Sequence, residues 1–325
     1  MARIWEQTAG VAPDLIYNVG ETGLLYRCLP SRSYVSGLDR GVVRCSKAIR
    51  SKDLVTLTLC CNAPGSHKLP ITMIGKAANP MCFNGDQNRC LLPYFSLRSA
   101  WTDGHVLKTL FFEVFVPGLG PQTASHVFLI LDNLSCCSEI GHPQVIKIKL
   151  SPNRTARCKP LDKRIIAATM RRYKTPYWGR VAASLFRLIA SGDPNPRVPR
   201  GGGLDQGGQA HLLDAARMVK EEWAQITPVQ IANCWLSAEV LPAKADAEIR
   251  RPLNGDLPVA DSVLTDVSEV VSLLANTGLA DDFVGVSEEE RSRAVERWFV
   301  VEDDVSTIAQ EVDMILAGED EDYVA

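Results

Sequence analysis

Two aspartates stand where a folded chain could use them to hold a metal ion. Asp132 directly follows the apolar run Val127–Leu131, whose β-branched and aromatic residues predict a central strand buried on both faces. Side chains at the end of such a strand leave the packed layer and face a crevice, which makes Asp132 a candidate metal ligand. The alternative is that Asp132 and Asn133 only cap the turn that leaves the strand.

Asp162 is the second candidate ligand. Pro160 is a favourable residue for the start of a helix, and the apolar positions that follow, from Ile165 to Tyr173, recur with a period of 3.6 residues. We expect Asp162 in the first turn of this helix, on the side that faces the sheet, where the helix dipole stabilises a carboxylate. A lone aspartate there commonly stabilises its helix and does nothing else. Its pairing with Asp132 in one strand-loop-strand-helix unit favours a shared ion site.

The charge of the chain is distributed unevenly. Residues 1–202 contain 27 Lys and Arg against 12 Asp and Glu, a net charge of +15, whereas residues 203–325 contain 8 against 26, a net charge of −18. A basic region of this size suits a polyanion such as DNA, because each cation near a phosphate releases condensed counterions. The alternative is that the two regions neutralise each other within the fold.

Candidate contacts to a nucleic-acid backbone come from three segments: a basic loop near residue 30, the segment before Asp162, and the outer face of the helix that Asp162 opens. The same positions would also suit plain solvation. The residues concerned are Arg32, Arg154, Arg157, Lys159, Lys163, Arg164, Arg171 and Arg172.

The elements that must position these residues form an α/β pattern. Three strands are expected to make an antiparallel meander, followed by a helix, the central strand and a strand nearer the sheet edge, in which Ile and Lys alternate with a period of two. Their expected ranges are Asp14–Asn18, Leu54–Cys61, Lys68–Ile74, Thr102–Val114, Val127–Leu131 and Val145–Leu150.

Length and composition limit the class of protein. With 325 residues, of which 46% are hydrophobic and 22% charged, we expect one large domain or one domain with an appendage. Residues 1–10 lack the apolar core of a signal peptide, and no apolar run approaches a membrane span. The ten cysteines include no Cys-x-x-Cys motif and only five histidines accompany them, so we expect reduced thiols and no zinc site.

Several segments, taken in order, resemble the DDE superfamily endonuclease domain of pogo/Tigger-type transposases, the group that includes centromere protein B-like proteins. Asn18–Leu24 resembles the family's Asn-x-Asp-Glu-Thr-Gly-Leu motif, and Leu29–Tyr34 resembles Leu-Pro-Ser-Arg-Thr-Tyr. The resemblance covers about residues 13–240. The further matching segments are Cys60–Lys68, Ile74–Phe83, Ala100-Trp101, Leu131–Cys137, Ser151–Asp162, Trp223–Pro228 and Ile231–Trp235.

This resemblance implies an RNase H-like mixed sheet flanked by helices, whose acidic residues hold two Mg²⁺ or Mn²⁺ ions. Two such ions would stabilise the attacking and leaving oxygens of a phosphodiester displacement. Asp132 matches the second acidic position of the family and Asp162 the third. The first falls on Gly20, which has no side chain to offer.

Gly20 decides the enzyme question. Glu21 is the nearest acid, but one residue along an extended strand its side chain points to the opposite face, so it could substitute only through a bulge. Three further departures agree with decay of the site: Cys137 replaces a family histidine, Lys159 replaces a glutamine, and Lys163-Arg164 replace neutral residues. The added cations could offset carboxylates that no longer hold metal, or they could strengthen contact with DNA.

Three hypotheses about function follow. The first is a nuclear, transposase-derived protein that binds DNA through its basic domain and has a degenerate catalytic site. The second is an active metal-dependent endonuclease that uses Glu21, Asp132 and Asp162, and the third is a product without DNA function. The sequence leaves self-association and assembly with an intact transposase open. No helix-turn-helix module is expected before the first strand, so the DNA sequence that is recognised stays open too.

The domain organisation follows from the same resemblance. We expect a DDE-type domain at residues 13–240 that contains a Pro/Gly-rich loop at residues 191–208 and a later helix that begins at Thr227-Pro228. Residues 241–325 are expected to form an acidic extension, with a polar connector followed by amphipathic helices at Ser262–Ala275, Ser287–Phe299 and Val305–Leu316.

Overall fold

A mixed β-sheet lies at the centre of the structure, a computed structural model that describes residues 2–27, 53–97, 104–120, 126–131, 141–150, 158–190, 203–204 and 208–253. Within these residues, the strand order is β4-β3-β2-β1-β5-β6. The strands are β1 (Ile16–Leu25), β2 (Leu54–Asn62), β3 (Thr72–Gly75), β4 (Tyr94–Ser96), β5 (Val127–Leu131) and β6 (Val145–Lys149).

The directions of the strands confirm the expected RNase H-like α/β class. β1 and β2 are antiparallel, as are β2 and β3, so the expected meander is present. β5 and β6 then join the other side of β1 in parallel, and β6 ends the order as an edge strand. A mixed sheet of this kind brings the carboxyl end of β5 beside the first part of β1, because Asn18 pairs with Ile130.

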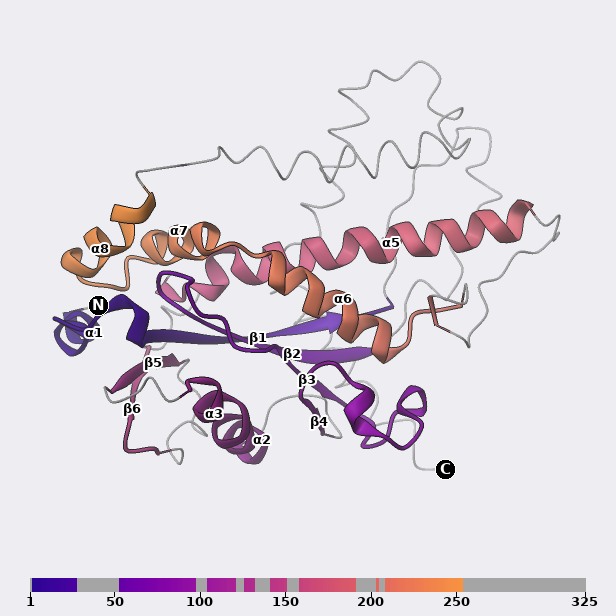
Figure 1. The fold of residues 1–325 in the computed structure, drawn as a ribbon, viewed down its shortest axis with the longest axis horizontal. Helices are drawn as coiled ribbons and strands as arrows, with labels where there is room; N and C mark the ends of the chain where they lie inside the picture. Colours follow the sequence, from indigo (N-terminus) through magenta and orange to yellow (C-terminus); the bar gives the residue numbers. More distant parts are fainter. Residues whose placement is uncertain are drawn as a thin grey trace, which may run out of the picture. The chain divides into compact units, whose positions relative to one another are not determined.

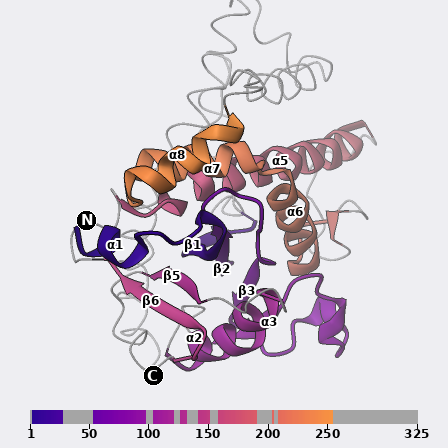
Figure 2. The ribbon, with the colours of Figure 1, turned by 60° about the vertical axis from the view of Figure 1, so that its left-hand side comes forward.

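Two groups of helices cover the sheet. Figures 1 and 2 show α5 (Ile166–Ala190) and α7 (Pro228–Ala238) on one side, and α2 (Gly104–Leu110) and α3 (Val116–Gly118) on the other. The remaining helical segments are α1 (Ala2–Thr8), η1 (Pro13–Leu15), η3 (Met81–Phe83), η4 (Gln87–Arg89), the π-turns η5 (Phe111–Phe115) and η7 (Leu161–Ile165), α6 (Leu212–Gln225) and α8 (Ala243–Leu253). No helix in the described part of the chain is long and apolar enough to cross a membrane.

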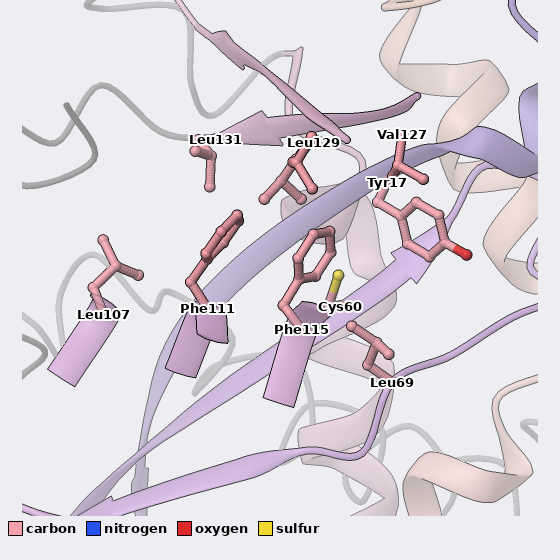
Figure 3. Packing of buried hydrophobic residues seen from close by; sticks show 10 residues of the cluster. Tyr17, Cys60, Leu69, Leu107, Phe111, Phe115, Val127, Leu129 and Leu131 are labelled. Atoms are coloured by element: carbon pink, nitrogen blue, oxygen red, sulfur yellow. The ribbon is translucent and has the colours of Figure 1, made fainter. Parts of the chain in front are cut away.

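The hydrophobic core between α2 and the sheet holds the central strand β5 in position. Val127, Leu129 and Leu131 project from β5 toward Phe111 and Phe115, as Figure 3 shows. The two phenylalanine rings stack with centroids 5.5 Å apart, and Tyr17 meets Phe115 edge to face at 6.0 Å. Burial of this many large apolar side chains fixes β5 against β1 and so fixes where β5 ends.

Several boundaries differ from those expected. β1 continues beyond Asn18 to Leu25, because Gly20 and Gly23 remain paired with β2 instead of ending the strand. The polar connector expected after Leu241 is wrong at its start, where the helix α8 forms and Pro252 occupies the last turn. The amphipathic helices expected between residues 262 and 316, and nearly all of the loop at 191–208, lie outside the described residues.

Candidate functional site

Gly20 lies in an unbroken stretch of β1. Its partner across the antiparallel ladder is Leu59, and the next residue, Glu21, pairs with Thr58 without an extra residue on either strand. Successive side chains of a regular strand point to opposite faces. Gly20 therefore belongs to the face of the sheet toward η7, and Glu21 belongs to the other face.

The space beside Gly20 is filled by apolar side chains. A Cβ atom at this position would lie 3.0 Å from Cδ1 of Leu161 and 3.2 Å from Cδ1 of Ile166. Leu161 is completely buried and comes from η7, the segment that also carries Asp162. At the position where the family motif has its first carboxylate, this chain has closely packed apolar side chains.

Asp162 sits next to a buried lysine. The ammonium Nζ of Lys159 lies 3.6 Å from Oδ2 of Asp162, and the two side chains are 8% and 32% exposed. The aspartate thus reaches solvent in part, whereas the lysine is covered. At this separation the two charges attract each other, although the distance is long for a hydrogen bond.

The start of the long helix is distorted, which changes the direction of Asp162. Inside η7 the backbone leaves helical values at Lys163 (φ −79°, ψ 39°) and at Arg164, whose φ of 93° is rarely adopted by a residue with a side chain. Leu161 and Ile165 consequently face the sheet, and Asp162 is at the surface. The regular helix expected from residue 160 would have turned Asp162 toward the sheet, and this part of the expectation is wrong.

Asn18 joins the two segments that precede the aspartates. Its amide nitrogen donates to the carbonyl of Ile130 in β5 at 3.1 Å, and its amide oxygen accepts from the backbone N–H of Leu161 at 3.1 Å. The side chain is fully buried. Sequence reasoning missed this role, and a polar residue inside an apolar strand was the available signal, because a buried amide must find hydrogen-bond partners.

Helix α7 packs on the distorted segment from outside. The burial of Cys234, a residue of α7, raises the pKa of its thiol to about 11, and the nearby positive charge of Arg164 acts against this rise. Thr227 and Gln230 form a reciprocal cap at the start of α7, which confirms the expected helix start. A well-anchored helix therefore packs against the segment that contains Arg164.

The motif Cys60–Lys68 positions helices instead of forming a site. Lys68 donates from Nζ to the carbonyls of Trp223 and Ile226, both at 2.7 Å, and so caps the carboxyl end of α6. At Gly65, whose φ is +72°, a Cβ would lie 2.7 Å from Cα of Pro228 at the start of α7. Only glycine permits this close approach.

The other predicted site residues fall into two groups. Asp132, Arg32, Arg154 and Arg157 lie outside the described residues, although β5 is described up to Leu131, which is buried. Among the described residues no three His, Cys, Asp or Glu side chains gather as a metal site would require. Lys159 is buried beside Asp162. The described basic residues that are at least partly exposed are Lys163, Arg164, Arg171 and Arg172.

Comparisons with known proteins agree with the α/β fold described above. The family model of the DDE superfamily endonuclease matches residues 52–235. The chain is 33% identical to the Jerky protein of Mus musculus over 177 residues, which is 51% of this chain and 30% of that protein. It is 34% identical to Tigger transposable element-derived protein 4 of Mus musculus over 139 residues, which is 42% of this chain and 24% of that protein.

A third relative covers more of the chain. CENP-B homolog protein 2 of Schizosaccharomyces pombe is 24% identical over 282 residues, which is 83% of this chain and 49% of that protein. The chain thus spans between about a quarter and a half of the length of these relatives. No solved structure matches it. Its sheet order, its motifs and the family match over more than half of its residues assign this chain to the DDE superfamily endonucleases, among the proteins derived from pogo/Tigger-type transposases.

Proposed function

We propose that this chain is a transposase-derived, nuclear, nucleic-acid-binding protein that has lost metal-dependent strand cleavage. The observation that carries the proposal is the state of the first acidic position. Gly20 offers no ligand, and the volume that a ligand would need is filled by Leu161 and Ile166.

The remaining donors do not fit a pair of divalent ions. Mg²⁺ and Mn²⁺ prefer several oxygen ligands, and a carboxylate that bridges two ions is the usual centre of such sites. In this chain Asp162 has the cation of Lys159 beside it, and Glu21 belongs to the opposite face of β1. The geometry therefore supports loss of cleavage over substitution of the missing ligand by Glu21.

Retained binding is supported by the distribution of charge. Residues 1–202 have a net charge of +15, and η7 with the following part of α5 contributes the partly exposed side chains of Lys163, Arg164, Arg171 and Arg172. Contacts of this kind follow the phosphate backbone and carry little sequence information. We therefore propose DNA as the partner and expect weak discrimination between sequences.

A cleavage assay on the full chain tests the loss of activity. Supercoiled plasmid incubated with the purified protein and millimolar Mg²⁺ or Mn²⁺ should remain uncut, and Asp162→Asn should behave identically. Metal-dependent nicking by the unmodified chain that Asp162→Asn abolishes would refute the proposed loss. Nicking that persists in Asp162→Asn would indicate a contaminating nuclease, and the preparation would then be repurified until the two proteins can be compared.

Fluorescence anisotropy with a labelled duplex tests the binding. The logarithm of the affinity should fall linearly with the logarithm of salt concentration, and Arg171→Gln combined with Arg172→Gln should make the slope shallower by about one to two phosphate contacts. Lys108→Gln is the matched control, because Lys108 is exposed on α2, on the other side of the sheet. An affinity that does not depend on salt would contradict DNA binding through this surface.

A further inference from the structure

Lys159 is a charged residue in a buried position. The whole residue is 6% exposed, and its side chain is 8% exposed. Lysine is almost never covered to this extent unless an opposite charge accompanies it, because the ammonium loses its hydration. Among the described residues, the carboxylate of Asp162 supplies that opposite charge, 3.6 Å from Nζ.

The backbone holds these two residues in a fixed relation. The N–H of Leu161 donates to the side chain of Asn18 at 3.1 Å, which anchors the segment to β1. The N–H of Lys163 donates to the carbonyl of Pro160 at 3.1 Å and closes the turn that contains Asp162. Since the turn between the two residues is closed and attached to β1, bringing the two charges together costs less conformational entropy than in a free segment.

The burial of Lys159 separates two explanations for the extra cations near Asp162. A phosphate contact requires a donor that solvent, and therefore a nucleic acid, can reach. Lys163 is half-buried and Arg164 is exposed, so they meet this requirement better than Lys159 does. The cation of Lys159 is covered and lies beside the carboxylate of Asp162, which family members would use for metal.

We infer that Lys159 serves as an internal counter-ion, and that its ammonium balances the charge of Asp162 in place of a divalent cation. The inference rests on the proposed function, and it explains how the chain tolerates a former metal ligand without the metal. Two changes therefore separate this site from one that holds a pair of metal ions, a carboxylate at position 20 and removal of the lysine charge, and removal of the lysine charge alone should permit weak binding of one ion.

Manganese binding to the full chain tests the inference directly. Titration calorimetry should detect no Asp162-dependent Mn²⁺ site in the unmodified protein or in Lys159→Arg, which keeps the charge. Lys159→Gln should gain a weak, Asp162-dependent Mn²⁺ site for one ion, and Lys159→Gln combined with Asp162→Asn should lose it. Equal Mn²⁺ affinities of the unmodified chain and Lys159→Gln would overturn the inference.

A second measurement decides the matter if Lys159→Gln does not fold. Asp162→Asn changes a surface residue, yet it should lower the melting temperature by several degrees, because it leaves Lys159 covered and without its counter-charge. Lys108→Gln, the exposed control, should change it by less than about one degree. An unchanged melting temperature in Asp162→Asn would also overturn the inference.

The two proposals can fail separately. Metal-dependent nicking by the unmodified chain would refute the proposed loss of cleavage, whatever the stability of the variants. If only the counter-ion inference is wrong, the plasmid should remain uncut. Neither the affinity for Mn²⁺ nor the melting temperature should then depend on the Lys159 and Asp162 pair.

Discussion

At the scale of single residues, the absence of a side chain at Gly20 is accompanied by close packing of its neighbours. Gly20 is flanked at 3.0 to 3.2 Å, measured to a hypothetical Cβ, by atoms of Leu161 and Ile166. A Cβ atom at these distances would lie closer to its neighbours than normal packing allows. Even a methyl group would therefore require the two side chains to shift by a few tenths of an ångström. The glycine and the leucine therefore depend on each other.

The first prediction concerns the direct reversal of this change. Gly20→Asp should lower the free energy of unfolding by about 2 to 4 kcal/mol, because it overfills a packed region and covers a carboxylate with hydrocarbon. Urea denaturation measures the loss. Gly141→Asp is the matched control, because a Cβ at Gly141 meets nothing within 4 Å. Equal unfolding free energies in the two variants would show that Leu161 moves aside freely.

At the scale of elements, the sequence predicted those parts of the fold that local pattern determines. β2, β5 and β6 were placed within one or two residues, because long runs of β-branched and apolar residues or a strict alternation identify them. The three-residue edge strand β4 escaped notice, since Tyr94–Ser96 is too short for any periodicity. The existence of α7 followed from Thr227 and Pro228, which begin it.

The distortion in η7 could not be predicted, and with it the direction of Asp162. The residues from 161 to 173 have a helical period, but the N–H of Leu161 is bound by Asn18, which is 143 positions away in sequence, and α7 packs on the same segment. Contacts from distant parts of the chain therefore impose a backbone that the local sequence disfavours at Arg164. For Lys159, sequence reasoning left two roles open, offsetting a carboxylate and contacting DNA, because the pattern does not show that its side chain is buried.

The second prediction concerns the attachment of α6. Lys68→Met should lower the free energy of unfolding by about 2 kcal/mol, because the carbonyls of Trp223, Ala224 and Ile226 lose a charged donor at the end of the helix. Chemical denaturation measures this effect. Lys76→Met, at an exposed position, should change the free energy by less than about 0.5 kcal/mol. Similar losses in both variants would contradict the capping role.

At the scale of the whole molecule, buried acidic groups make stability depend on pH. Burial raises the pKa of the Cys61 thiol from 9.0 to about 12, and burial likewise raises the pKa of Tyr17, Tyr26 and Tyr94 from 10.0 to about 12. Each group holds its proton more tightly in the folded chain than in the unfolded one. Its stabilising contribution is complete below pH 9 to 10 and is lost as the pH rises through about 12.

The third prediction follows from the upward direction of these pKa shifts. The free energy of unfolding should be nearly constant from pH 7 to 8.5 and then decrease with rising pH, by up to about 1.4 kcal/mol per pH unit for each group in its window. Urea denaturation at pH 8, 9.5 and 11 measures the decrease. Thiol reagents at pH 9 should leave Cys60 and Cys61 unmodified until the chain unfolds. Stability that rises between pH 9 and 11 would contradict the assigned burial.

The contact between Leu161 and Gly20 also limits how this lineage can evolve. A descendant that regained an aspartate at position 20 would first become less stable, and the positive charge at position 159 would still keep metal away. Selection for DNA cutting could reward the pair of mutations but neither one alone. Under the proposed function, the loss of the ancestral reaction is therefore difficult to reverse by single mutations.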